Sequence, residues 1–204
     1  MSSSAVERGW EKIRKDYWGL REVEVVTREM RLYAVRKNPR VLSIIAAADQ
    51  DEDICAAALE IDGEAYQWVR VMSPKLDQLA VAQNGEALRW IASEKRTREL
   101  CWEAVGQTGL ALQYVPENLR THELCMAAVQ KTGRAVQFVP NQTLDLCLAA
   151  VRQNGRALYV IKNKTPEVCT AAVQQNAWAL RWVKEPRPDL CLLALHGGYG
   201  EMKK

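Results

Sequence analysis

A unit of 22 to 24 residues recurs along almost the whole chain, and this repeat limits the possible folds more than any other feature. Five cysteines mark the unit at residues 101, 125, 147, 169 and 191, at steps of 24, 22, 22 and 22. Cys55 lies two steps before Cys101 with Asp77 between them, and one further step back falls on Arg31. We call this aligned residue the cysteine position of each repeat. The regular step predicts a chain built from copies of one small structural unit.

Other positions keep the same register. Four residues before the cysteine position stands a hydroxyl or carboxylate side chain in seven copies: Thr27, Asp51, Ser73, Thr97, Thr121, Thr143 and Thr165. Two residues before it stands an acid, and eight residues after it stands Gly63, Gly85, Gly109, Gly133 or Gly155. A capping side chain followed by an acid is typical of a helix start, because both interact with the free N–H groups there. We expect the glycine to end this helix in a left-handed conformation, and a second, shorter helix to follow.

Helices of about 8–10 residues are marginal alone in water, so each pair must be stabilised by packing against its neighbours. The sequence therefore predicts an all-α protein, an α-solenoid of about seven two-helix repeats of 22–24 residues with capping helices. Residues 1–26 are expected to form an N-terminal capping helix, residues 27–197 the solenoid, and residues 198–204 a flexible tail.

The six cysteines suggest no disulfide or metal site. Equivalent residues of stacked repeats lie about one helix spacing apart, roughly 8–10 Å, which exceeds the reach of a disulfide. No C-x-x-C pair occurs, and His122 and His196 belong to no repeated ligand pattern. We expect the cysteines to be small buried side chains in a reducing compartment, and we expect no cofactor.

The clearest copy of the repeat, residues 146–158 (LCLAAVRQNGRAL), resembles short tandem repeats of an uncharacterised family known only as a domain of unknown function. The resemblance extends over roughly residues 27–197. Such repeats are associated with bacteria, effectors of intracellular pathogens, protists, phages and large DNA viruses. The resemblance implies a helical-repeat fold, and it carries no established activity or catalytic residues.

Two rows of polar side chains run through the repeats. The first row, six residues after the cysteine position, contains Gln107, Lys131, Gln153 and Gln175. The second row, twelve residues after it, contains Gln67, Arg89, Gln113, Gln137 and Arg181. A regular series of amides can hydrogen-bond the backbone of an extended peptide, and Arg or Lys suits acidic segments or phosphates. These nine residues are our candidate partner-binding residues, although Gln is also common on solvated helix faces.

A large side chain follows each residue of the second row: Ile44, Trp68, Trp90, Tyr114, Phe138, Val160 and Trp182. Such a series could stack on the bases of a single-stranded nucleic acid. Ile and Val cannot stack usefully, so packing between repeats is the favoured interpretation of this series.

No catalytic set is found, and we therefore expect a non-enzymatic binding module or adaptor that engages a protein or peptide partner, for example as an effector or inhibitor. The alternative is single-stranded nucleic-acid binding along a groove formed by Arg89, Lys131, Arg134, Arg156 and Arg181. The net charge of +3 is too small to decide between the two. No signal peptide or membrane-length apolar run occurs, so we expect a protein of the cytoplasm, or of a host cell's cytoplasm, without a membrane partner.

Overall fold

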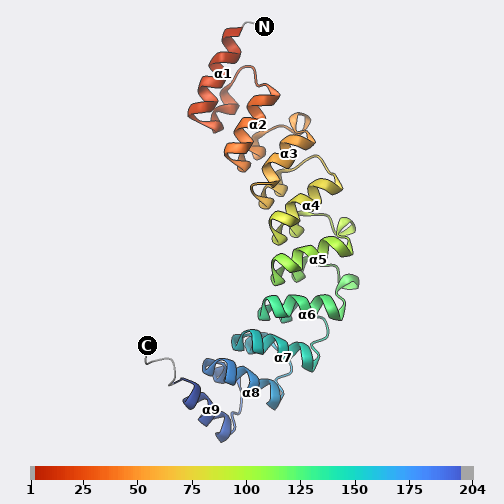
Figure 1. Ribbon diagram of the computed structural model, residues 1–204, viewed down its shortest axis with the longest axis vertical. Coiled ribbons are helices and arrows are strands. Elements are labelled where there is room, and N and C mark those ends of the chain that lie inside the picture. Colours follow the sequence, from red (N-terminus) through yellow and green to blue (C-terminus); the bar gives the residue numbers. More distant parts are fainter. Residues whose placement is uncertain (1–2, 199–204) are drawn as a thin grey trace. The chain divides into compact units, whose positions relative to one another are not determined.

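A computed structural model describes residues 3–198, and no strand occurs in that range. Each repeat is an α-helix followed by a six-residue 3₁₀ helix, written η. Figure 1 labels the α-helices in chain order. The pairs are α2 (Arg28–Lys37) with η2 (Pro39–Ile44), α3 (Glu52–Leu59) with η4 (Gly63–Trp68), α4 (Pro74–Gln83) with η5 (Gly85–Trp90), α5 (Arg98–Gln107) with η7 (Gly109–Tyr114), α6 (His122–Lys131) with η9 (Gly133–Phe138), α7 (Leu144–Gln153) with η10 (Gly155–Val160), and α8 (Pro166–Gln175) with η11 (Ala177–Trp182). The predicted all-α helical-repeat fold is confirmed, with a 3₁₀ helix as the second element.

Additional elements flank these pairs. The predicted N-terminal cap contains α1 (Ser3–Lys15) and η1 (Tyr17–Glu22), which pack on each other. At the other end, α9 (Pro188–Gly198) packs on α8 and η11. Gly198, which we assigned to the tail, is the last residue of α9, and residues 199–204 lie outside the described residues.

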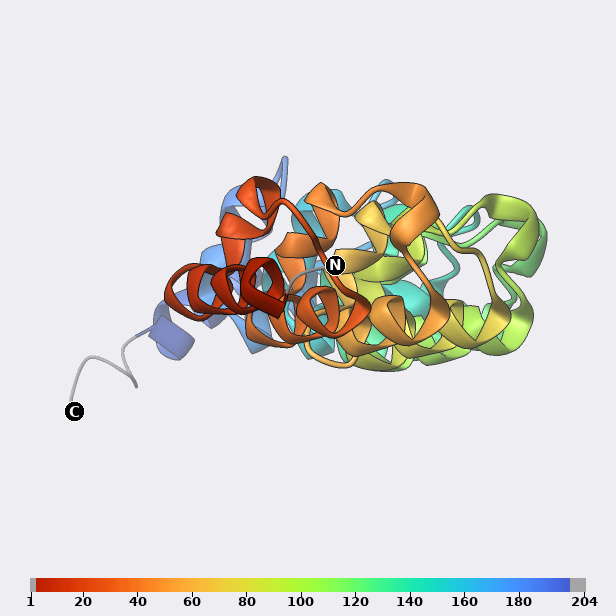
Figure 2. The same ribbon diagram turned by 90° about the horizontal axis from the view of Figure 1, so that it is seen from above.

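The chain divides into two compact units, Met1–Lys95 and Arg96–Lys204. In the first unit α2 packs on α3 and α3 on α4, and in the second α5 to α9 pack in the same serial way. Within each unit, α-helices of successive repeats lie one over the next when seen from above (Figure 2). We call the contact between two consecutive repeats a seam. None of the helices between residues 3 and 198 combines the length and apolarity that a bilayer span requires.

The helix starts follow the sequence prediction. Thr27, Asp51, Ser73, Thr97, Thr121 and Thr165 each accept a hydrogen bond from the backbone N–H three residues later. Thr143 differs, because its hydroxyl donates to the Asp145 carboxylate instead. The caps satisfy N–H groups that have no partner within the helix, and so fix where each α-helix begins.

The prediction of a left-handed glycine was wrong, since no glycine in residues 3–198 has a positive φ. The helix ends one residue earlier at an extended residue such as Asn154 (φ −156°, ψ 111°), whose side chain then caps the 3₁₀ helix by accepting from the Arg156 N–H at 3.0 Å. The glycine is required by packing. A Cβ on Gly63 would lie 2.4 Å from the Ala80 carbonyl oxygen of the next repeat, and one on Gly133 would lie 2.5 Å from that of Ala150.

Asp77 is a buried acid at a position where most repeats have cysteine, and it is only 6% exposed. Its carboxylate accepts a hydrogen bond from the hydroxyl of Tyr66, which is also buried. Tyr66 stands where the other repeats have Leu or Val, so both partners of this contact change together. Burial and the Asp77 hydrogen bond raise the pKa of Tyr66 well above its ordinary value.

The repeats of 24 residues contain one additional element. An extra 3₁₀ turn occurs at η3 (Ala47–Asp49), η6 (Ser93–Lys95) and η8 (Glu117–Leu119), each within a 24-residue step. No such turn occurs in the 22-residue steps of the described chain. The two additional residues are therefore accommodated in the loop between repeats.

Candidate binding surface

The first polar row lies at the ends of the α-helices, and part of it holds the repeats together. The Gly133 N–H donates to Gln153 Oε1 at 2.8 Å, and the Gly155 N–H donates to Gln175 Oε1 at 2.6 Å. The same contact in the first unit joins Gly63 to Gln83 at 2.7 Å. These glutamines therefore satisfy a backbone N–H at the seam, a structural role that the sequence analysis did not predict. The other two candidates of this row, Gln107 and Lys131, are exposed at the ends of α5 and α6.

A second set of polar contacts at the seams was missed from the sequence. Five residues before the cysteine position, Gln50, Arg96 and Arg120 donate to the carbonyls of Trp68, Tyr114 and Phe138 in the next repeat. Gln142 occupies the same position and accepts from the Lys162 N–H at 2.9 Å. We call this the bridging position. Its fixed spacing before the cysteine position was the only signal in the sequence.

The second polar row lies on the 3₁₀ helices, where the two arginines are exposed and the three glutamines are half-buried. In the first unit, Gln67 donates to the Glu64 carbonyl at 3.0 Å. In the second unit, Gln113, Gln137 and Arg181 lie on η7, η9 and η11. Because η7, η9, η10 and η11 pack in succession, these residues fall into one series within that unit.

The two units differ in the charge of this row. In the first, Arg89 forms an ion pair with Glu64, lies 4.0 Å from Glu86, and stacks over Trp90. In the second, the four six-residue 3₁₀ helices contain Arg134, Arg156 and Arg181 and no acidic residue. All three arginines are exposed, and within the described residues none of them is in an ion pair.

Aromatic side chains accompany these arginines. Tyr159 on η10 is 66% exposed and Trp178 on η11 is 70% exposed. The Tyr159 and Trp182 rings lie 6.0 Å apart, and the Arg181 guanidinium lies 5.7 Å from the Trp182 ring. We call the exposed and half-buried polar and aromatic side chains of this series the basic–aromatic face: Gln113, Arg134, Gln137, Arg156, Tyr159, Trp178, Arg181 and Trp182.

The aromatic series that follows the second row is partly buried. Trp68, Tyr114, Phe138 and Trp182 are half-buried, whereas Trp90 is 41% exposed. Their rings therefore pack against the repeats and still leave part of their surface to solvent.

The cysteines are free thiols, and most of them are buried. Cys55, Cys101, Cys125, Cys147 and Cys169 are buried, and Cys191 is partly exposed. Burial raises the pKa of the Cys55 and Cys101 thiols to about 11, and that of the other three buried thiols in the same direction. No group of three or more His, Cys, Asp or Glu side chains arranged to hold a metal ion occurs in residues 3–198.

The acidic side chains of residues 49–53 form ion pairs within the first unit. Arg28 pairs with both Asp51 and Asp53 at 2.5 Å. Arg31 pairs with Asp49 at 2.7 Å. These carboxylates already have cationic partners, so they provide little free charge to a ligand.

Residues 97–144 match DUF4116, a domain of unknown function. The matched segment begins at the capping residue of α5 and ends at the first residue of α7, so it contains two whole repeats. This fits the resemblance to an uncharacterised domain over that part of the chain. No curated protein and no solved structure matches the chain.

Proposed function

We propose that this chain is a non-enzymatic binding module or adaptor that engages an extended, acidic segment of a protein partner. The observation that carries the proposal is the basic–aromatic face, where three exposed arginines and several aromatic rings lie on successive 3₁₀ helices that contain no acid. A surface with one sign of charge attracts a partner of the opposite sign and raises the rate of association.

The chemistry of this face suits a peptide backbone. The amides of Gln113 and Gln137 offer hydrogen-bond donors and acceptors, although the Gln113 N–H group already donates to the Leu110 carbonyl at 3.2 Å. Tyr159, Trp178 and Trp182 supply large, stiff contact areas between the arginines. The repeating spacing would let successive residues of an extended segment meet equivalent side chains.

The remaining candidates take secondary roles in this proposal. Gln67 and Arg89 extend the second row into the first unit, where Glu64 and Glu86 neutralise Arg89. Gln107, Lys131, Gln153 and Gln175 have exposed side chains at the helix ends, where they would contact only a partner larger than one extended segment.

A pull-down with a matched pair of double variants tests the proposal. The chain is used as bait in extract from the cells that encode it, with and without nuclease. We expect one protein at near-equal amounts, retained with Arg98→Gln/Arg152→Gln, which removes two exposed charges from α5 and α7, and lost with Arg156→Gln/Arg181→Gln. Equal recovery with both double variants would exclude the basic–aromatic face.

Single-stranded nucleic acid is the second candidate, favoured by the interleaving of Arg134, Arg156 and Arg181 with exposed aromatic rings. This candidate predicts that the affinity for a labelled 20-nucleotide strand falls steeply with salt, because bound phosphates release counterions. Fluorescence anisotropy from 50 to 300 mM salt measures the slope, and a flat response removes this candidate.

The cellular setting is also part of the proposal. Five buried, unpaired thiols suit a reducing compartment, and we place the protein in the cytoplasm of a bacterium or of a host cell. The resemblance to repeats associated with pathogen effectors and viruses suggests an effector or inhibitor that acts by occupying another protein.

A further inference from the structure

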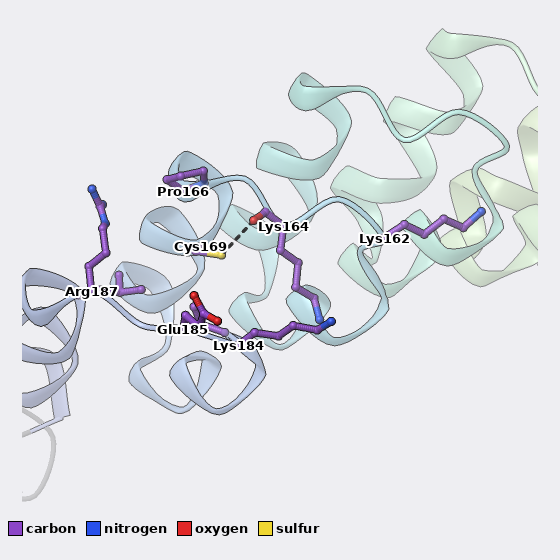
Figure 3. Close-up of a pocket in the computed structure, with 9 residues that line it drawn as sticks. Lys162, Lys164, Pro166, Cys169, Lys184, Glu185 and Arg187 are labelled. Atoms are coloured by element: carbon purple, nitrogen blue, oxygen red, sulfur yellow. Dashed lines mark hydrogen bonds between the residues drawn. The ribbon is translucent and has the colours of Figure 1, made fainter.

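A pocket of about 370 Å³ opens at the last seam of the second unit, between the start of α8 and the segment that joins η11 to α9 (Figure 3). Four cations line it, Lys162, Lys164, Lys184 and Arg187, against one acid, Glu185. Part of its wall is apolar and includes Val183 and Leu190.

The pocket coincides with a bridging position that is not used. At two other seams a bridging glutamine accepts from a backbone N–H: Gln50 from Arg70 at 2.9 Å, and Gln142 from Lys162 at 2.9 Å. Lys164 occupies the equivalent position here, and the equivalent backbone N–H belongs to Lys184. A lysine side chain has no acceptor, so the Lys184 N–H lacks the partner that its counterparts have.

The lysine side chains add positive charge at the same place. In the view of Figure 3 the ends of the Lys164 and Lys184 side chains lie together, whereas Lys162 and Arg187 point away from them. Arg187 also lies 3.4 Å from Asp189, which offsets its charge. Four cations against one acid leave the pocket with net positive charge, and a bound oxyanion would relieve the repulsion between the ammonium groups.

We infer that this pocket binds an oxyanion joined to an apolar group, a carboxylate or a phosphate monoester whose acidic end contacts Lys164, Lys184 and the Lys184 N–H. The apolar part of the ligand lies against Val183 and Leu190. Backbone N–H groups and lysines together are a common means of binding carboxylates and phosphates. The inference is independent of the proposed function, because the pocket does not include the residues of the basic–aromatic face.

The experiment titrates the ¹⁵N-labelled full chain with 3-phenylpropionate, phenyl phosphate and the uncharged 3-phenylpropanamide, and follows the amide signals by NMR. We expect the two anions to shift the Lys184, Val183 and Leu190 amides to saturation, and the uncharged amide to bind at least about tenfold more weakly because it lacks the charge-assisted contacts. The relative response to the two anions then distinguishes a carboxylate ligand from a phosphate ligand.

Lys164→Gln is the decisive variant, because glutamine at this position can take the Lys184 N–H and close the seam as Gln142 does. We expect it to weaken anion binding about tenfold or more and to raise the melting temperature. Lys162→Gln removes an equal charge from the same pocket but should change the affinity less than about threefold, since its side chain points away (Figure 3).

A third variant, Lys164→Met, keeps the pocket open without the charge and should also lose anion binding. Saturation by the uncharged amide as readily as by the anions would overturn the inference. Unchanged anion binding by Lys164→Gln or Lys164→Met would overturn it equally. The pull-down with Arg156→Gln/Arg181→Gln is a separate measurement, so the two conclusions can fail independently.

Discussion

Two seams, one in each unit, are built alike at the backbone and differently at the side chains. In the first unit Gly63 meets the Ala80 carbonyl and donates to Gln83 at 2.7 Å, and in the second Gly133 meets the Ala150 carbonyl and donates to Gln153 at 2.8 Å. Between these contacts, the first seam buries the Tyr66–Asp77 hydrogen bond, whereas the second buries Val136 and Cys147 at the same two positions.

The difference indicates which contacts can vary. Gly63 and Gly133 face main-chain atoms, which are the same in every sequence, so no compensating substitution is available. Tyr66 and Asp77 face each other, so both can be exchanged for an apolar pair if they change together. The four predictions below test the contacts at the seams and in the core, from the largest expected effect to the smallest.

Gly133→Ala should destabilise the protein by about 3 kcal/mol, because its Cβ would lie 2.5 Å from a carbonyl oxygen that cannot move away without shifting α7. Gly63→Ala should behave alike in the first unit, where the distance is 2.4 Å. Urea unfolding followed by circular dichroism measures both. Gly106→Ala is the control, because nothing lies within 4 Å of its Cβ, and we expect it to stabilise α5 by about 0.5–1 kcal/mol. Destabilisation by all three alike would contradict the packing explanation.

Tyr66→Phe should cost about 2 kcal/mol, because it leaves the buried Asp77 carboxylate without its hydroxyl donor. The double variant Tyr66→Leu/Asp77→Cys introduces the pair found elsewhere in the chain, and its stability should lie within about 1 kcal/mol of the natural protein. A double-mutant cycle in urea measures the coupling. Additive single effects would mean that the two side chains are independent and that their joint change has no physical basis.

Gln175→Ala should lower the free energy of unfolding by about 1–1.5 kcal/mol, because the N–H of the buried Gly155 loses its acceptor. Gln174→Ala changes the neighbouring exposed glutamine of the same helix and should shift stability by less than about 0.5 kcal/mol. Thermal unfolding of the two variants side by side gives the difference. Equal melting temperatures of the two variants would mean that the Gln175 side chain contributes no more to stability than an ordinary exposed side chain.

Alkaline pH should destabilise the protein through its buried thiols. The pKa of Cys101 is raised to about 11, whereas an unfolded thiol ionises near 9, so the unfolded state loses protons first and stability falls as the pH rises from about 9 to about 11. The loss at pH 10 should be about 1 kcal/mol for this thiol. Cys101→Ala should flatten the decline between pH 8 and pH 10.5 in urea unfolding, and an unchanged slope would show that the buried thiol stays ionisable in the fold.

Local features of the fold could be predicted from the sequence, because capping depends on residues three positions apart. Thr121 accepts from Leu124 and Asp51 from Ile54 as expected. The reason for the glycine could not be predicted, because the carbonyl that Gly63 meets lies at Ala80, one repeat away. The partners of Gln153 and Arg120 likewise lie too far away in the sequence to be predicted.

The candidate surface was predicted in part. The second row, with Gln113, Gln137 and Arg181, does lie on one series of 3₁₀ helices within a unit. The difference in charge between units required the structure, because Arg89 and Arg181 hold the same place in the repeat and only Arg89 faces acids on neighbouring turns. Whether the basic–aromatic face binds a partner stays a prediction.

The extra turns η3, η6 and η8 have a consequence for how such a chain can change over generations. A gain or loss of two codons at η8 (Glu117–Leu119) alters only the loop between two repeats, while the glycine and glutamine contacts keep their registration. A shift of one codon inside α6 would rotate every following side chain by about 100° and destroy that registration. Length variation among descendants of this sequence should therefore occur in the loops between repeats, in steps that leave the helices whole.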